Sequence, residues 1–91
     1  MPERRVTIGS ASGLHARPAA VFTQAAVASP AHVRITAGER TVDAGSILGV
    51  MSLAAQQGDE VLLSAEGPDA ERALEELARL LESDLDAVSQ D

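Results

Sequence analysis

Residues 13–27, which read GLHARPAAVFTQAAV, predict a tight loop that turns directly into a helix. Gly13 allows backbone angles that other residues avoid. The apolar residues that follow recur at helical spacing and form one stripe, made of Ala19, Phe22 and Ala26. Pro18 is tolerated only in the first turn, so we expect a helix over residues 16–27. Because the residue before a proline is biased away from helical angles, Arg17 lies either in the first turn or in the irregular segment before it.

The predicted start of this helix combines hydrogen-bond donors with positive charge, as the binding of an anion requires. His15 is expected at or just before the first turn, where the backbone N–H groups of Ala16 and Arg17 have no partner within the helix and the helix dipole is positive. Arg17 adds a charged fork of donors that suits phosphate oxygens. An imidazole that is partly neutral at cellular pH can act as a nucleophile. The residues therefore predict a phosphoryl acceptor, or alternatively a capping histidine beside an exposed arginine.

The rest of the chain alternates between strand and helix patterns. Strands are expected at residues 4–8, 32–36, 40–43 and 60–65, and further helices at 46 to about 53 and 70 to about 84. The order βαββαβα indicates an α+β fold, in which three helices gather on one face of a four-stranded, mostly antiparallel sheet. We expect one domain over residues 1–91, with an acidic tail at 85–91 that frays.

The periodicity also predicts which side chains form the core. In the strands, the inward residues are Val6, Ile8, Val33 and Ile35. On the last helix, the apolar side consists of Ala70, Leu74, Leu77, Ala78, Leu81 and Leu85. On its wet side, Arg72 with Glu76 and Glu75 with Arg79 are spaced for ion pairs.

Composition excludes several classes of function. The chain has no cysteine and two histidines, so neither disulfides nor a zinc enzyme is expected, and no metal or cofactor is predicted. A net charge of -7 and one phenylalanine as the only aromatic residue argue against nucleic-acid binding. No stretch is apolar enough for a signal core or a membrane span, so we expect a cytoplasmic protein that is not membrane-bound.

Two blocks of sequence resemble one known family. Residues 13–19, GLHARPA, are similar to the phosphorylation-site motif of HPr, the histidine-containing phosphocarrier of the phosphoenolpyruvate-dependent sugar phosphotransferase system. Residues 45–53, GSILGVMSL, resemble the regulatory-serine segment of that family, at the spacing the family shows. The similarity continues through residues 41–42, 58–67 and the final helix, and so covers nearly the whole chain.

The resemblance implies a fold, a reaction and partners. The fold is the open-faced β-sandwich of the family. His15 would accept a phosphoryl group on Nδ1 from phosphorylated Enzyme I and pass it to IIA-type sugar-permease components, with Arg17 stabilising the phosphate. Ser46 would be phosphorylated by a kinase and dephosphorylated by a phosphatase, and a transcriptional regulator would recognise the phosphoserine. Several relatives have a lysine where this chain has Gly45. A monomeric carrier without a catalytic cycle of its own is expected.

The helix at 46–53 begins at Ser46, which is well placed as its N-cap. This helix carries more apolar residues than one core-facing side requires. Ile47, Leu48 and Met51 are either all buried by the sandwich or form part of a protein-docking patch. In the family, such residues meet partner proteins together with residues of the first helix, here Ala20 and Gln24. Several relatives have lysines along that helix, whereas this chain has Gln24 and Val27. Affinity for partners is therefore expected to rest more on apolar contact and on Arg17 than on charge.

Other polar residues offer weaker candidates. The acidic pairs Asp59/Glu60 and Glu75/Glu76 are typical of a solvated surface. His32 is expected to be a structural or surface residue, because no acid or cysteine lies at ligand spacing from it. Ser10 and Ser12 either orient a phosphate or form the loop.

Three functional readings follow from these residues. The first is the phosphocarrier. The second is a regulatory binding module, of the catabolite-control or nitrogen-related type, that acts through the helix starting at Ser46. The third is a small hydrolase, which lacks a constellation of nucleophile, base and acid.

Overall fold

The computed structural model describes residues 2–9, 13–14 and 16–83. Its elements are β1 (Glu3–Thr7), α1 (Ala16–Ala28), β2 (His32–Ala37), β3 (Arg40–Asp43), α2 (Ile47–Ser52), β4 (Glu60–Glu66) and α3 (Ala70–Glu82). The predicted order βαββαβα is confirmed, with boundaries that differ by one or two residues. Ile8 lies just outside β1, and α3 ends before the expected residue 84. The expected tail at 85–91, Leu85 included, lies outside the described residues.

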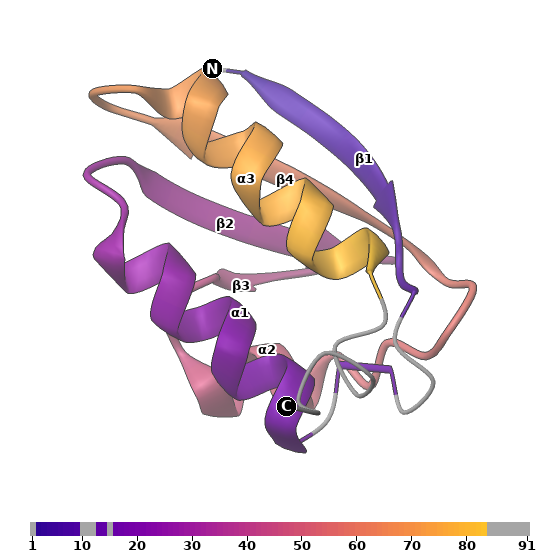
Figure 1. The fold of residues 1–91 in the computed structure, drawn as a ribbon. Coiled ribbons are helices and arrows are strands. Elements are labelled where there is room, and N and C mark those ends of the chain that lie inside the picture. The colour runs from indigo at the N-terminus through magenta and orange to yellow at the C-terminus, as the bar shows by residue number, and fades with distance from the viewer. Residues whose placement is uncertain (1, 10–12, 15, 84–91) are drawn as a thin grey trace.

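The four strands form one sheet in the order β1-β4-β2-β3, and every neighbouring pair is antiparallel. β4 therefore occupies a central position between the first two strands of the sequence. Figure 1 shows α1 and α3 lying side by side across one face of this sheet, with α2 at the end where α1 begins. The opposite face carries no helix in the described part of the chain, and Arg5, Arg34 and Thr41 are exposed.

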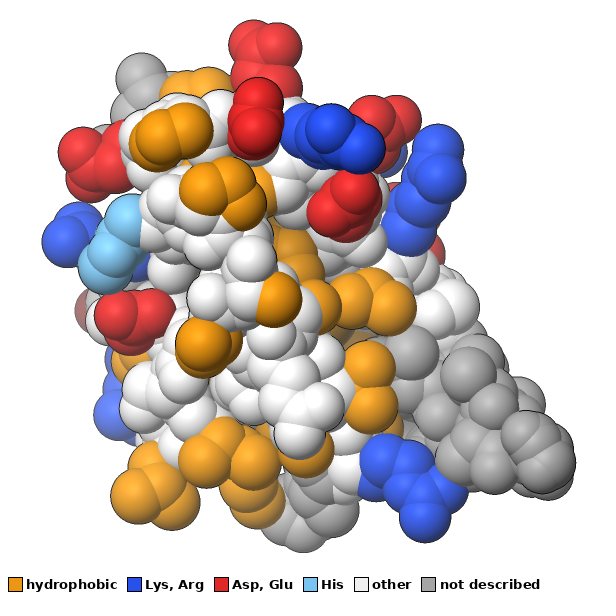
Figure 2. Space-filling view, turned by 60° about the vertical axis from the view of Figure 1, so that its left-hand side comes forward, with side chains coloured by type: hydrophobic (Ala, Val, Ile, Leu, Met, Phe, Trp, Pro, Cys, Tyr) orange, Lys and Arg blue, Asp and Glu red, His pale blue; other side chains and the backbone are white. Residues whose placement is uncertain are grey.

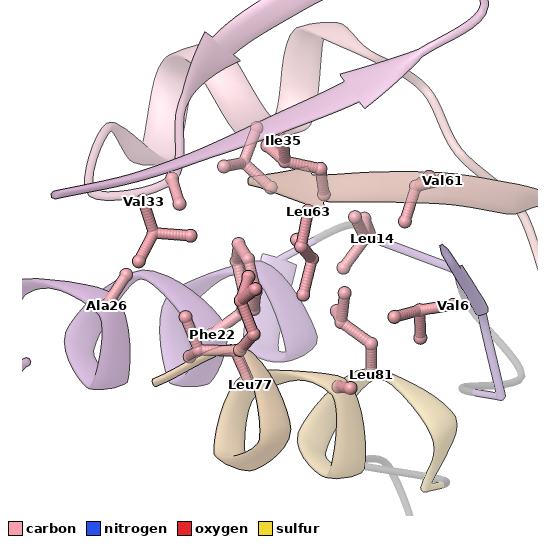
Figure 3. Close-up of a cluster of buried hydrophobic side chains, with 14 of the residues drawn as sticks. Val6, Leu14, Phe22, Ala26, Val33, Ile35, Val61, Leu63, Leu77 and Leu81 are labelled. Carbon is pink, nitrogen blue, oxygen red and sulfur yellow. The ribbon is translucent and has the colours of Figure 1, made fainter. Parts of the chain in front are cut away.

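The core fills the space between the sheet and the helices. Figure 3 shows Phe22 of α1 and Leu77 of α3 close to each other, with side chains of the sheet pointing toward them. Phe22 has no exposed surface, and the predicted stripe of α1 is buried with it. The four strand residues predicted to point inward, Val6, Ile8, Val33 and Ile35, are all at most 3% exposed. Burial of these apolar side chains is the main force that holds the helical layer to the sheet.

Helix α3 follows the predicted amphipathic pattern with one difference. Its buried residues are Ala73, Leu74, Leu77, Ala78 and Leu81. The difference is Ala73, which is buried although the prediction omitted it, while the predicted Ala70 is only half-buried. The expected pairs are present, with 3.6 Å between Arg72 Nε and Glu76 Oε2 and 3.5 Å between Arg79 Nη2 and Glu75 Oε2. Because these four side chains are more than half exposed, the pairs contribute little to stability.

Candidate functional site

The chain reaches the start of α1 through a point that is fixed by packing. Gly13 has a φ of 70°, a left-handed conformation that favours glycine, and a Cβ there would collide with the carbonyl oxygen of Ala55. The N–H of Leu14 donates to the same Ala55 carbonyl at 2.9 Å, and the Leu14 side chain is buried. His15, Ser10 and Ser12 lie outside the described residues. The structure thus fixes the backbone on both sides of His15, at Leu14 and at Ala16, the first residue of α1.

Arg17 lies in the first turn of α1, so the structure decides between the two positions that the sequence left open. Its side chain is exposed, while the next two residues, Pro18 and Ala19, are buried. Among the described residues, nothing forms a hydrogen bond or ion pair with Arg17, and no acidic residue occurs in the first turn of α1. The guanidinium is therefore available to an anion at the end of the helix that bears the positive dipole.

Ser46 caps α2 in the predicted way. It has extended backbone angles, and its Oγ accepts a hydrogen bond from the N–H of Gly49 at 3.1 Å. The preceding turn is closed by Asp43, whose carbonyl accepts from the Ser46 N–H at 3.0 Å and whose carboxylate accepts from the Gly45 N–H at 2.8 Å. At the other end of α2, Arg40 donates to the Ser52 carbonyl at 3.3 Å. These bonds hold a helix of six residues at both of its ends.

The apolar residues of α2 divide between core and surface. Val50 is fully buried and Met51 is half-buried, whereas Ile47 is 41% and Leu48 is 79% exposed. The alternative in which the sandwich buries all of these residues is therefore wrong for Ile47 and Leu48. On α1, Val27 is 69% exposed.

An open groove runs between α1 and α2 beside these side chains. Its lining residues are Ala20, Thr23, Gln24, Val27, Ala28, Gly45 and Ile47, none of which carries a charge. Figure 2 shows hydrophobic side chains gathered along the lower part of the molecule, where α1 begins and α2 lies, with most of the visible acidic side chains above them. We call Ala20, Gln24, Val27, Ile47 and Leu48 the apolar face; Met51 lies on its inner side, against the core.

Gly45 packs tightly beneath the apolar face. A Cβ at this position would lie 3.0 Å from Cγ2 of Val27 and 3.4 Å from Oδ1 of Asp43. A larger residue before Ser46 would push the Val27 side chain aside. The lack of a side chain at Gly45 therefore leaves room for Val27 in its present position.

Two features near these residues were missed by sequence reasoning. Nε2 of His32 lies 3.7 Å from Oδ2 of Asp43, because the antiparallel β2 and β3 bring residues 11 apart in the sequence together. Sequence spacing alone did not indicate this acid beside His32, and both side chains are about half exposed, as expected for a surface residue. The strand register would have revealed this pair. The described residues contain no group of three or more potential metal ligands.

The second missed feature is the segment after α2. Ala54 has a φ of 54°, a left-handed angle that costs a residue with a Cβ about 1 kcal/mol. This turn directs the Ala55 carbonyl toward Leu14. Two residues later, Nε2 of Gln57 donates to the Gly9 carbonyl at 3.1 Å. Nothing in the local pattern of residues 54–57 indicates contacts with a segment more than 40 residues earlier.

Comparison with known proteins gives a consistent result. The family model described as the PTS HPr component phosphorylation site matches residues 2–83. The phosphocarrier protein HPr of Streptomyces coelicolor is 44% identical over 91 residues, which cover 99% of this chain and 98% of that protein. The HPr-like protein Crh of Bacillus subtilis is 40% identical over 85 residues, covering 93% of this chain and 100% of Crh. The crystal structure of a phosphocarrier protein HPr from Bacillus anthracis matches with a TM-score of 0.86 at 44% identity, covering 88% of this chain and 95% of that one.

Within the described part of the chain, no helix is both long and apolar enough to cross a membrane.

Proposed function

Because this chain belongs to the HPr family of phosphotransferase-system phosphocarriers, we propose that it accepts a phosphoryl group on His15 from phosphorylated Enzyme I and passes it to IIA components during sugar uptake. The observation that carries this proposal is the start of α1. There the exposed Arg17, which pairs with no described residue, and the free N–H groups of the first turn adjoin His15 in sequence, and the first turn of α1 contains no acidic residue.

The proposed step is a substitution at phosphorus. A ring nitrogen of His15, which the family resemblance suggests is Nδ1, attacks the phosphorus atom and forms an N–P bond. The bond between phosphorus and the donor breaks, and its electron pair leaves with the donor group. Arg17 and the N–H groups of Ala16 and Arg17 offset the negative charge on the three equatorial oxygens. In the transfer to the acceptor, the N–P bond breaks and the His15 ring is the leaving group. The phosphorylated chain is therefore a covalent intermediate of the transfer, and the protein is not a stand-alone enzyme.

The apolar face supports the proposed partners. Ala20, Gln24 and Ile47 line one groove between α1 and α2, and the exposed Leu48 follows Ile47 on α2. Met51 packs against the core. A partner that binds in this groove would contact α1, the helix that follows residue 15 in the sequence. Large exposed apolar side chains that gather on one face are typical of protein-docking sites. We infer that the chain acts in the cytoplasm as a monomer of one domain, residues 1–91, without nucleic acid, membrane or cofactor.

A direct test is to incubate the protein with labelled phosphoenolpyruvate and Enzyme I. The proposal expects one acid-labile, alkali-stable phosphate per chain and its transfer to an added IIA component. No labelling under conditions in which Enzyme I is itself phosphorylated would contradict it.

A second candidate function is a regulatory binding module that acts through Ser46. Two observations support this second function: the similarity to the HPr-like protein Crh and the exposure of Ser46 at the beginning of α2. This function needs a Ser46 kinase and a transcriptional regulator as partners but not phosphorylation of His15. Acid-stable phosphate on Ser46 without acid-labile phosphate on His15 would favour it over the carrier.

We expect Ser46→Asp to remain as stable as the wild type yet to accept phosphate from Enzyme I more slowly. Aspartate caps helices as well as serine does, so the bond to the Gly49 N–H can be kept. The new charge lies beside Ile47, where it must be desolvated when an apolar partner docks. Thermal unfolding and the rate of phosphoryl acceptance are measured on the same variant.

Ser46→Ala is the control, because it removes the cap without adding charge. It should lose about 1 kcal/mol of stability and keep its rate. An unfolded Ser46→Asp variant would contradict the role of Ser46 as a cap, and a stable variant with an unchanged rate would contradict docking on α2.

We expect Arg17→Lys to slow phosphoryl acceptance by roughly tenfold, or about 1.4 kcal/mol in the barrier, with no change in folding. Lysine keeps the charge but loses the planar pair of donors that binds two phosphate oxygens at once. Because the Arg17 side chain is exposed and pairs with no described residue, its replacement removes no hydrogen bond or ion pair among them. Transfer rates are measured in both directions by rapid quench. Rates equal to those of the wild type would show that Arg17 is only a surface charge.

A further inference from the structure

Gly9 is a junction between three parts of the molecule. Its N–H donates to the Leu81 carbonyl in the last turn of α3 at 2.8 Å, and its carbonyl accepts from Nε2 of Gln57 at 3.1 Å. A Cβ on Gly9 would collide with the carbonyl oxygen of Glu82, so the backbone is pressed against the end of α3. Gly9 is also the last described residue before residues 10–12, which lead to His15 by way of Gly13 and Leu14.

The segment after α2 holds the chain on both sides of residues 10–12. On the far side, the Ala55 carbonyl accepts from the Leu14 N–H at 2.9 Å. On the near side, Gln57 binds the Gly9 carbonyl, and the N–H of Gly58 donates to the Ile8 carbonyl at 2.9 Å. All of these are backbone-to-backbone bonds except that of Gln57. Of these hydrogen bonds, only the one made by the Gln57 side chain can be removed by a substitution.

We propose that Gln57 is a positioning residue for phosphoryl transfer at His15, acting through the Gly9 carbonyl. The proposal rests on the function proposed above. The amide donor of Gln57 fixes where the chain leaves β1 and enters the segment before His15, while the Ala55 carbonyl fixes where that segment ends. Transfer of a phosphoryl group requires the acceptor within a narrow range of position and direction, and a displacement of about 1 Å can cost up to a hundredfold in rate. Gln57 needs no contact with the phosphate to have this effect.

The test compares three variants. Gln57→Met keeps the length of the side chain and removes the donor. Gln57→Lys restores a donor that can reach the same carbonyl. Gln56→Met makes the same change one residue earlier, where the side chain is exposed and, among the described residues, forms no hydrogen bond. Rates of phosphoryl acceptance are measured over a range of Enzyme I concentrations, and the His15 ring protons are followed by NMR in the unphosphorylated protein.

For Gln57→Met we expect kcat for acceptance to fall about fivefold with KM changed by less than about twofold, because Gln57 does not line the groove of the apolar face. Gln57→Lys should regain most of the rate, and Gln56→Met should match the wild type. The His15 ring signals should move in Gln57→Met by more than in Gln56→Met. An unchanged kcat in Gln57→Met, a rise in KM instead, or no rescue by lysine would overturn the proposal.

The two proposals fail in different ways. If the wild type accepts no phosphate, the carrier function is wrong, and the NMR comparison alone decides whether Gln57 positions His15. If the wild type is labelled and Gln57→Met is labelled at the same rate, the carrier function stands and the role of Gln57 is wrong.

Discussion

His15→Ala is expected to abolish phosphoryl acceptance and to leave the fold intact. Alanine has no nitrogen that could attack phosphorus, and neither Arg17 nor the backbone N–H groups can replace it as a nucleophile. The buried side chains around this position belong to Leu14, Pro18 and Ala19, which remain unchanged. Labelling with phosphoenolpyruvate and Enzyme I measures acceptance, and circular dichroism with thermal unfolding measures the fold.

The chain provides a matched control for this experiment in its only other histidine. His32 is exposed at the start of β2, and its partner within reach is the half-exposed Asp43. His32→Ala should keep full labelling and nearly full stability, since an exposed pair contributes about 1 kcal/mol or less. Stoichiometric labelling of His15→Ala, or its loss in His32→Ala, would assign the phosphate to another residue.

The second large effect is on stability. Phe22→Ala should destabilise the protein by about 3–5 kcal/mol, because the only aromatic side chain of the chain has no exposed surface and lies where α1 meets α3 and the sheet. A domain of this size has a free energy of unfolding of about 5–15 kcal/mol, so a large part of its stability would be lost. Chemical denaturation at 25 °C measures the change as a shift in midpoint.

Val27→Ala is the corresponding surface control on the same helix. Val27 is 69% exposed and should change stability by less than about 0.5 kcal/mol. A loss below about 1 kcal/mol for Phe22→Ala would show that the core can close around the missing ring.

The sequence was sufficient to predict the features that depend on residues close together along the chain. Alternation in the strands and the stripe Ala19, Phe22 and Ala26 identified the core, because burial follows local periodicity. Ser46 was identified as a cap because capping needs only the residue itself and an N–H three positions on. The family, and with it the fold, followed from two short motifs.

What the sequence could not provide depends on contacts between distant segments. The exposure of Leu48 next to the burial of Val50 depends on how α2 rests on α1 and β3. The hydrogen bond from Gln57 to Gly9 spans 48 positions, and the approach of His32 to Asp43 requires the register of two strands. The roles of His15, Arg17, Ser46 and the apolar face remain predictions, to be tested by the variants above.

The strand order has a consequence for how this protein forms during its synthesis. The central strand β4 is the last of the four to leave the ribosome, and both β1 and β2 need it as their partner. Until Glu66 has emerged, β1 has no strand to pair with, and the apolar sides of β1, β2 and α1 have no complete core to join. Pairing across so long a stretch of chain slows folding, because the entropy of loop closure is lost before the contacts are gained. We therefore expect nascent chains that end before residue 60 to be unfolded and sensitive to proteases.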